Sequence, residues 1–271
     1  MHNAAHSCHY PSRLVRRLTE MGIIGKPVSA DQFAESVGSL LDFSGSVTLS
    51  NMLGELSHAP VEPGGNTPET IKSEFLKSHA GLVRDIVKSF IPRLGSSRNR
   101  LPSPSEFFAN CMLKDVFSKS SGAGMPNSAA AYAPYRKHYL SIQGQLAIAS
   151  ERLRMKMARD VAGLSPMLAG LAGMDKGLGD AFYDLQSQLL GRIPEYLEHH
   201  FTHLLSKNWM ILPAGSDVSH LAPWMAPGGW ISLFCDQMQE LLFAELELRL
   251  LPVVGMIEAA CNSKRDWTET L

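Results

Sequence analysis

The segment from Gly228 to Pro252 constrains the fold of this chain more than any other part of its sequence. It is the most apolar long stretch, yet it also contains Asp236, Glu240, Glu245, Glu247 and Arg249. Each of these charges would be costly at the centre of a bilayer, so the segment does not predict a membrane span. A helix so rich in leucine must instead bury its apolar surface, either inside this chain or against a partner.

Two expectations follow for this C-terminal helix. Glu245 and Arg249 have the i, i+4 spacing of a surface ion pair. Leu241 and Leu248 are candidate contacts for a partner. We favour a helix that closes this chain's own bundle and leaves part of its surface for a partner.

Composition limits the classes of protein and compartment. The 271 residues are 45% hydrophobic and 19% charged, with a net charge of -1, which predicts no general attraction to nucleic acid or anionic membranes. The four cysteines are scattered without a C-x-x-C pair, a pattern typical of a reducing compartment. The first residues lack the apolar region of a signal peptide, and no uncharged apolar run of about 18 residues occurs. We therefore expect a cytoplasmic protein without a membrane span.

Helix-starting patterns recur along the chain, and strand patterns are nearly absent, so the sequence predicts an all-α fold. Ser29 and Gln32 indicate a helix start before residues 33–41, and Thr67-Pro68-Glu69 indicates another. Residues 103–106, SPSE, form a capping box. The Pro- and Gly-rich residues 57–66 suggest a small N-terminal helical module at 11–56 and a main helical bundle at 67–262, or one continuous domain.

Two long helical segments dominate the middle of the chain. One is expected from about Pro134 to Ala162, and the other from about Asp175 to Lys207 with a bend at Pro194. The short, glycine-containing region 163–173 between them predicts an antiparallel helical hairpin, and Ser165-Pro166 within it indicates the start of a short helix. Residues 213–229 are expected to form a long loop.

The sharpest chemical candidate is a metal site at Glu195, His199 and His203. These residues are four apart, so one helical face would present a carboxylate and two imidazoles. The sequence lacks the glutamate of the zinc-protease motif H-E-x-x-H, because His200 occupies that position. A solvated polar helix face is the favoured interpretation, and metal binding is the alternative.

The helix expected at residues 136–159 is basic. Its cations are Arg136, Lys137, Arg152, Arg154, Lys156 and Arg159. Nucleic-acid binding through them is one alternative, and a docking face for an acidic protein surface, with Arg152 and Arg159 as candidate contacts, is another. The acidic C-terminal helix offers an internal complement, which favours an ordinary solvated face.

Trp224 and Trp230 flank Pro227-Gly228-Gly229 and are further candidate contacts for a partner. If exposed, they would anchor a partner, and if buried, they would hold the loop over the bundle, which is the favoured interpretation. The chain contains no phosphate-binding loop, dinucleotide fingerprint or hydrolase nucleophile motif. The sequence therefore predicts no catalytic residues and no cofactor, and does not favour an enzyme.

Three blocks of this sequence resemble an uncharacterised proteobacterial family known only as a domain of unknown function (family 3348). They are SRLVRRL at 12–18 with DQFAE at 31–35, YAPYRKHYL at 132–140, and GGW at 228–230 with LLFAELELRL at 241–250 and PVVG at 252–255. The resemblance covers nearly the whole chain and implies no reaction. It suggests a cytoplasmic accessory role beside envelope components, including an OmpA-like peptidoglycan-binding protein.

The leading hypothesis from the sequence is a non-enzymatic helical interaction or scaffold protein that binds a protein partner or itself. It depends on the long amphipathic helices and the leucine-rich C-terminal block.

Overall fold

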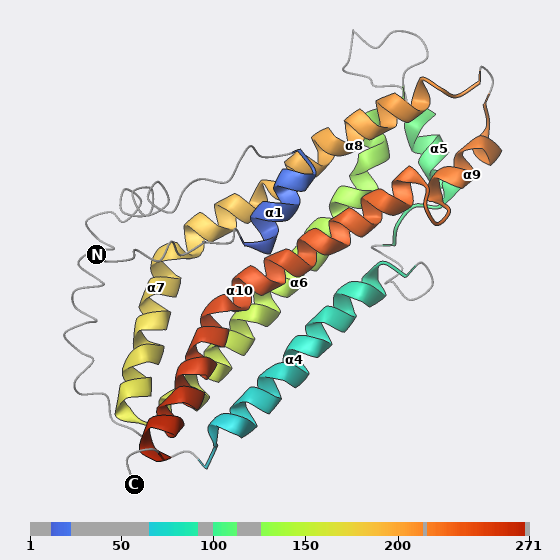
Figure 1. The fold of residues 1–271 in the computed structure, drawn as a ribbon. Helices are drawn as coiled ribbons and strands as arrows, with labels where there is room; N and C mark the ends of the chain where they lie inside the picture. The colour runs from blue at the N-terminus through green and yellow to red at the C-terminus, as the bar shows by residue number, and fades with distance from the viewer. Residues whose placement is uncertain (1–11, 23–64, 92–99, 113–125, 214–215, 269–271) are drawn as a thin grey trace, which may run out of the picture. The chain divides into compact units, whose positions relative to one another are not determined.

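The computed structural model describes residues 12–22, 65–91, 100–112, 126–213 and 216–268. Every regular element within these ranges is an α-helix, so the predicted all-α class is confirmed. In chain order the helices are α1 (Arg13–Glu20), α4 (Pro68–Ser89), α5 (Pro104–Met112), α6 (Ser128–Ala162), α7 (Pro166–Gly191), α8 (Ile193–Trp209), α9 (Val218–Met225) and α10 (Trp230–Thr268) (Figure 1). Across the described ranges, no helix combines the length and apolarity that crossing a membrane requires.

Contacts divide the chain into two compact units. Unit 1 consists of Met1–Leu76, Glu151–Gln186 and Glu247–Leu271, and unit 2 consists of Lys77–Ser150 and Ser187–Leu246. Helices α4, α6, α7 and α10 each contribute residues to both units. The expected module at 11–56 and the helix expected at 33–41 lie mostly or wholly outside the described residues, so the predicted division at 57–66 stays a prediction.

Two helix starts follow their sequence signals. At the start of α4, the Thr67 hydroxyl accepts a hydrogen bond from the backbone N–H of Thr70 at 3.3 Å. At the start of α5, the carboxylate of Glu106 accepts from the backbone N–H of Ser103 at 2.8 Å, and the Ser103 hydroxyl accepts from the N–H of Glu106 at 3.4 Å. This reciprocal pair is the predicted capping box, and it satisfies backbone donors that a helix start otherwise leaves free.

Helix α6 begins earlier than the sequence indicates. Asn127 supplies the N-cap, since its side-chain oxygen accepts from the N–H of Ala130 at 2.9 Å. Pro134 therefore lies inside the helix rather than at its start. A proline there removes one backbone hydrogen bond, and the side chains of Tyr132 and Tyr135 on either side of it are buried, which offsets this cost.

The connection between the two long helices is also shorter than expected. Helix α7 begins at Pro166, where the Ser165 hydroxyl accepts from the N–H of Leu168 at 3.3 Å. The helix start indicated by Ser165-Pro166 is therefore the start of the second long segment, before the glycines that suggested a turn. The single helix expected from about Asp175 to Lys207 is in fact two helices. Helix α7 ends at Gly191, and α8 follows with Pro194 in its first turn.

The segment expected as a long loop at 213–229 contains α9. Its N-cap is Asp217, whose carboxylate accepts from the N–H of Ser219 at 2.9 Å, while the His220 ring accepts from the N–H of Asp217 at 3.3 Å. Histidine in place of the usual Glu or Gln partly hides this capping box in the sequence. In unit 2, α9 packs beside α5 (Figure 1).

Each unit has its own apolar core. In unit 1, buried side chains come from α1, α4, α6, α7 and α10, and they include Leu14, Ile71, Met157, Leu168, Val253 and Ile257. In unit 2, the core is rich in aromatic rings, and it includes Phe107, Tyr132, Tyr135, Phe201 and Phe234. Burial of such side chains supplies most of the free energy that holds helices together.

Candidate functional site

Unit 2 gathers aromatic rings around Trp224 and Trp230. Their ring centroids lie 5.4 Å apart, and Phe107 lies 6.4 Å from Trp224 and 6.3 Å from Trp230. Phe201 lies 5.5 Å from Trp230, and Trp209, at the end of α8, lies 6.4 Å from Trp224. Both predicted tryptophans are only partly exposed. The rings thus join α5, α8, α9 and the start of α10, as expected if these tryptophans hold the segment before α10 in place.

Two glycines make this arrangement possible. Gly228 has φ +85°, a conformation that side-chain-bearing residues rarely adopt. A Cβ atom on Gly229 would lie 2.5 Å from the backbone carbon of Trp224, and the carbonyl oxygens of Pro223 and Trp224 would be nearer still. The turn between α9 and α10 therefore closes tightly and sets Trp224 against Trp230.

Beside this aromatic cluster lies an exposed apolar pair that the sequence did not single out. Met210 and Ile211, directly after α8, are 70% and 77% exposed. Lys207 and Asp217, which precede and follow the pair in the chain, are also exposed. Hydrogen bonds from the hydroxyl and the backbone N–H of Ser219 lower the pKa of Asp217 to about 2, so this carboxylate is charged at neutral pH. The one sequence signal was the run of four apolar residues, Trp209 to Leu212, between Asn208 and Pro213.

A second feature of unit 2 is a buried polar cluster between α6 and α10. Glu245 is fully buried, which corrects its expected place in a surface ion pair. The Tyr139 hydroxyl donates to Oε1 of Glu245 at 2.5 Å, and the Gln143 amide donates to both carboxylate oxygens at 2.9 and 3.0 Å. The same amide nitrogen lies 3.0 Å from the Leu190 carbonyl oxygen. These bonds compensate for burying a carboxylate, and they specify how α6 and α10 align.

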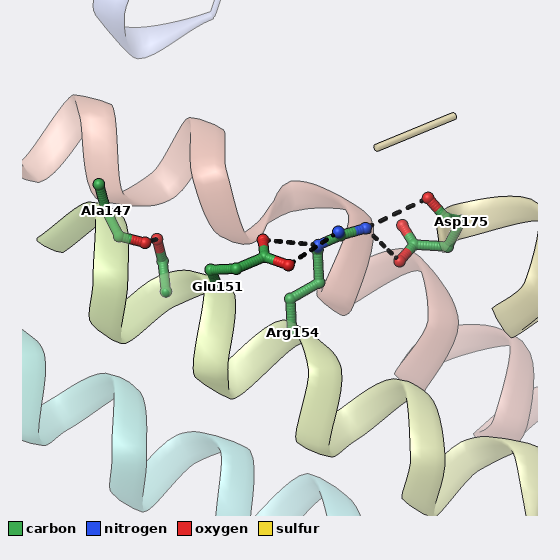
Figure 2. Close-up of polar contacts among 5 residues, drawn as sticks. Ala147, Glu151, Arg154 and Asp175 are labelled. Atoms are coloured by element: carbon green, nitrogen blue, oxygen red, sulfur yellow. Dashed lines mark hydrogen bonds and ion pairs between the residues drawn. The ribbon is translucent and has the colours of Figure 1, made fainter. Parts of the chain in front are cut away.

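In unit 1, the predicted basic stretch of α6 contains an internal ion-pair network. Figure 2 shows the Arg154 guanidinium between two carboxylates, with Glu151 at 3.0 Å and Asp175 at 2.9 Å. Hydrogen bonds to Glu151 raise the pKa of Arg154, and burial raises the pKa of Asp175 more than the facing guanidinium lowers it. Lys156 pairs with Glu74 of α4. Arg152 and Arg159 lie exposed on the same helix.

The candidate metal ligands Glu195, His199 and His203 are all exposed on α8. Within the ranges that the structure describes, no three His, Cys, Asp or Glu side chains are grouped to hold a metal ion. The neighbouring His200 has a different environment, because its Nε2 lies 3.0 Å from the Gln237 side-chain oxygen. Metal binding by the three exposed residues stays a prediction from their spacing.

The leucines of the C-terminal block are placed mainly in the cores. Leu241 and Leu242 are fully buried in unit 2, so a partner would meet Leu241 only if that core opened. Leu248 is half-buried, and Leu251 is 64% exposed. The apolar surface that α10 leaves to solvent is therefore small compared with what it buries.

Comparison with known proteins agrees with the sequence blocks described above. The family model described as "Protein of unknown function (DUF3348)" matches residues 1–262 of the 271. Neither the curated proteins nor the solved structures gave a match. Because the family match covers nearly the whole chain, the resemblance inferred from the three blocks is confirmed. The chain belongs to the family of proteins of unknown function DUF3348.

Proposed function

We propose that this protein is a non-enzymatic helical scaffold that self-associates through the end of unit 2. The observation that carries this proposal is the exposure of Met210 and Ile211, at 70% and 77%, beside partly exposed tryptophan rings. Adjacent apolar side chains of this size are costly to leave in water, and aromatic rings at their edge are frequent contributors to binding energy.

A second copy of the chain is the partner that suits this surface. A twofold interface places the same patch of both subunits together, so the patch must be complementary to itself. Apolar side chains meet this requirement. Lys207 and Asp217 also meet it, because the exposed cation of one copy can face the exposed carboxylate of the other.

Light scattering after size-exclusion chromatography tests this proposal with the full chain. We expect a mass that rises toward that of a dimer as concentration increases. The double variant Met210→Ser/Ile211→Ser should weaken self-association by roughly a hundredfold or more, since two apolar side chains are lost from each copy. Met167→Ser is the matched control, because Met167 is 68% exposed but lies on α7 in unit 1.

Two results would contradict the proposal. One is a wild-type chain that stays monomeric up to about 100 μM, a concentration at which even weak specific dimers form. The other is an equal loss of dimer in Met167→Ser and in the double variant, which would indicate nonspecific association of exposed methionines.

The proposal extends to a reducing compartment and an accessory role beside envelope components. The state of the cysteines supports the reducing compartment. Three of them are free, namely Cys111, Cys235 and Cys261. Burial raises the pKa of the Cys111 and Cys235 thiols to about 12. The family resemblance supports the second part. Co-purification of the tagged chain with an OmpA-like protein would support this role, and no co-purification would contradict it.

A further inference from the structure

The four cations between residues 152 and 159 of α6 fall into two classes. Arg154 is only 13% exposed at its side chain and is held by Glu151 and Asp175. Lys156 is paired with Glu74. Unit 1 therefore neutralises two of the four cations with its own carboxylates.

Arg152 and Arg159 form the second class. Both are exposed, and within the described part of the chain neither has a hydrogen bond or ion pair. The acids beside them in the sequence offer no compensation, because Glu151 is bonded to Arg154 and Oδ2 of Asp160 is buried. Two positive charges thus remain without a complement on the part of α6 that belongs to unit 1.

These two arginines share one face of α6. They are seven residues apart, which is about two helical turns or about 10 Å along the axis. Met155 lies between them on the same face and is 56% exposed. The helix therefore presents an arginine, an exposed apolar side chain and a second arginine in line.

We propose that this Arg152–Met155–Arg159 face docks an acidic amphipathic helix of a partner protein. The matching segment has two carboxylates about two turns apart and an apolar side chain between them. Carboxylates accept bidentate hydrogen bonds from guanidinium groups, and the apolar side chain covers Met155. The face belongs to unit 1, so this docking is independent of the self-association proposed for unit 2.

A protein helix suits this face better than a nucleic acid. Phosphate contacts gain affinity from counterion release, which grows with the number of cations, and only two cations of the Arg152–Met155–Arg159 face are uncompensated. The net charge of -1 gives the chain no long-range attraction to a polyanion. An exposed methionine between the arginines adds nothing to phosphate binding, whereas it adds buried apolar area against a helix.

Fluorescence anisotropy with synthetic peptides tests the proposal on the full chain. The first probe is a labelled helical peptide that has two glutamates seven residues apart and a leucine midway between them. The second probe has lysines in place of the glutamates, and the third is a labelled single-stranded RNA. The variants are Arg152→Glu/Arg159→Glu, the conservative Arg152→Lys/Arg159→Lys, and the control Lys176→Glu, an exposed position on α7 in the same unit.

We expect the acidic peptide to bind the wild-type chain with an affinity that falls as salt rises. Charge reversal of both arginines should lower this affinity roughly tenfold and allow the lysine peptide to bind, since two ion pairs change to repulsion. The conservative variant should retain most of the affinity, and Lys176→Glu and Met210→Ser/Ile211→Ser should leave it unchanged.

Three results would overturn the proposal. They are no binding of the acidic peptide at about 1 mM and low salt, equal affinity for the wild-type and charge-reversed chains, and tighter binding of the RNA than of the peptide. Circular dichroism of each variant confirms that α6 remains helical. Because all of the substituted side chains are exposed, we expect no loss of helix.

Discussion

Replacing Gly229 with alanine tests whether the turn between α9 and α10 is as tightly closed as its geometry indicates. The new Cβ would lie 2.5 Å from the backbone carbon of Trp224 and closer to two carbonyl oxygens. These distances are at least about 1 Å shorter than a relaxed contact. Backbone atoms cannot rotate away as a side-chain end can, so the end of α9 must move.

The magnitude follows from what that movement disturbs. Trp224 packs against Trp230, Phe107 and Trp209, and each such ring pair contributes about 0.5–1.5 kcal/mol beyond its buried area. Overpacking of a well-filled site costs about 1–3 kcal/mol by itself. We therefore expect Gly229→Ala to lower the free energy of unfolding by about 3 kcal/mol.

Urea unfolding followed by tryptophan fluorescence and circular dichroism measures this change, and two glycines provide matched controls. Gly228→Ala should cost about 1–2 kcal/mol, because its φ of +85° strains any residue with a Cβ. Gly144→Ala, on an exposed part of α6 with nothing within 4 Å of the added carbon, should instead stabilise by about 0.5–1 kcal/mol. A Gly229→Ala cost no greater than that of Gly228→Ala would refute the tight packing of the turn.

Three further predictions concern polar contacts. Tyr139→Phe removes the hydroxyl that donates to buried Glu245, so we expect a loss of about 2 kcal/mol in urea unfolding, and a loss below about 0.5 kcal/mol would contradict the network. Gly179→Ala places a carbon 2.8 Å from Cζ of Arg154, so it should destabilise the wild-type chain by about 1 kcal/mol. In an Arg154→Ala variant this clash is absent, so the same substitution should stabilise the chain through the higher helix propensity of alanine. Because the folded pKa of Asp217 is lowered to about 2, its contribution to capping α9 is present above the unfolded value of about 3.9 and is lost as pH falls through 2. Titration of this carboxyl by NMR checks the last prediction, and a midpoint near 4 would show that the cap is not formed.

The helix starts were predictable because their signals are local. The capping box at Ser103 and Glu106, and the threonine before Pro68, satisfy backbone donors within three residues. The start of α9 was missed because histidine replaces the usual partner in its capping box. The helix start at Ser165 and Pro166 was indicated as that of a short helix, but the glycines that follow suggested a turn, so the long helix was expected to begin later, at about Asp175.

The environment of each charge was not predictable, because it depends on residues distant in the sequence. Glu151, three residues before Arg154, is a local partner for this arginine, but the second partner, Asp175, lies 21 residues away and could not be inferred from spacing. Lys156 similarly finds Glu74 82 residues away. Helical spacing relates Glu245 to its neighbours on α10. It does not reveal that Tyr139 of α6, 106 residues earlier in the chain, donates a hydrogen bond to the Glu245 carboxylate.

The buried Glu245 cluster also restricts how α10 can move against α6 within unit 2. Packed helices in switching proteins sometimes shift past each other by one turn, about 5.4 Å. Such a shift would carry Glu245 away from both donors, so the buried Tyr139 hydroxyl would lose its present acceptor and the Gln143 amide would keep only the Leu190 carbonyl. It would also separate the carboxylate from the bonds that compensate for its burial. The present alignment is therefore favoured over one shifted by a turn, so we expect α10 to move together with α6 in this unit rather than to slide along it.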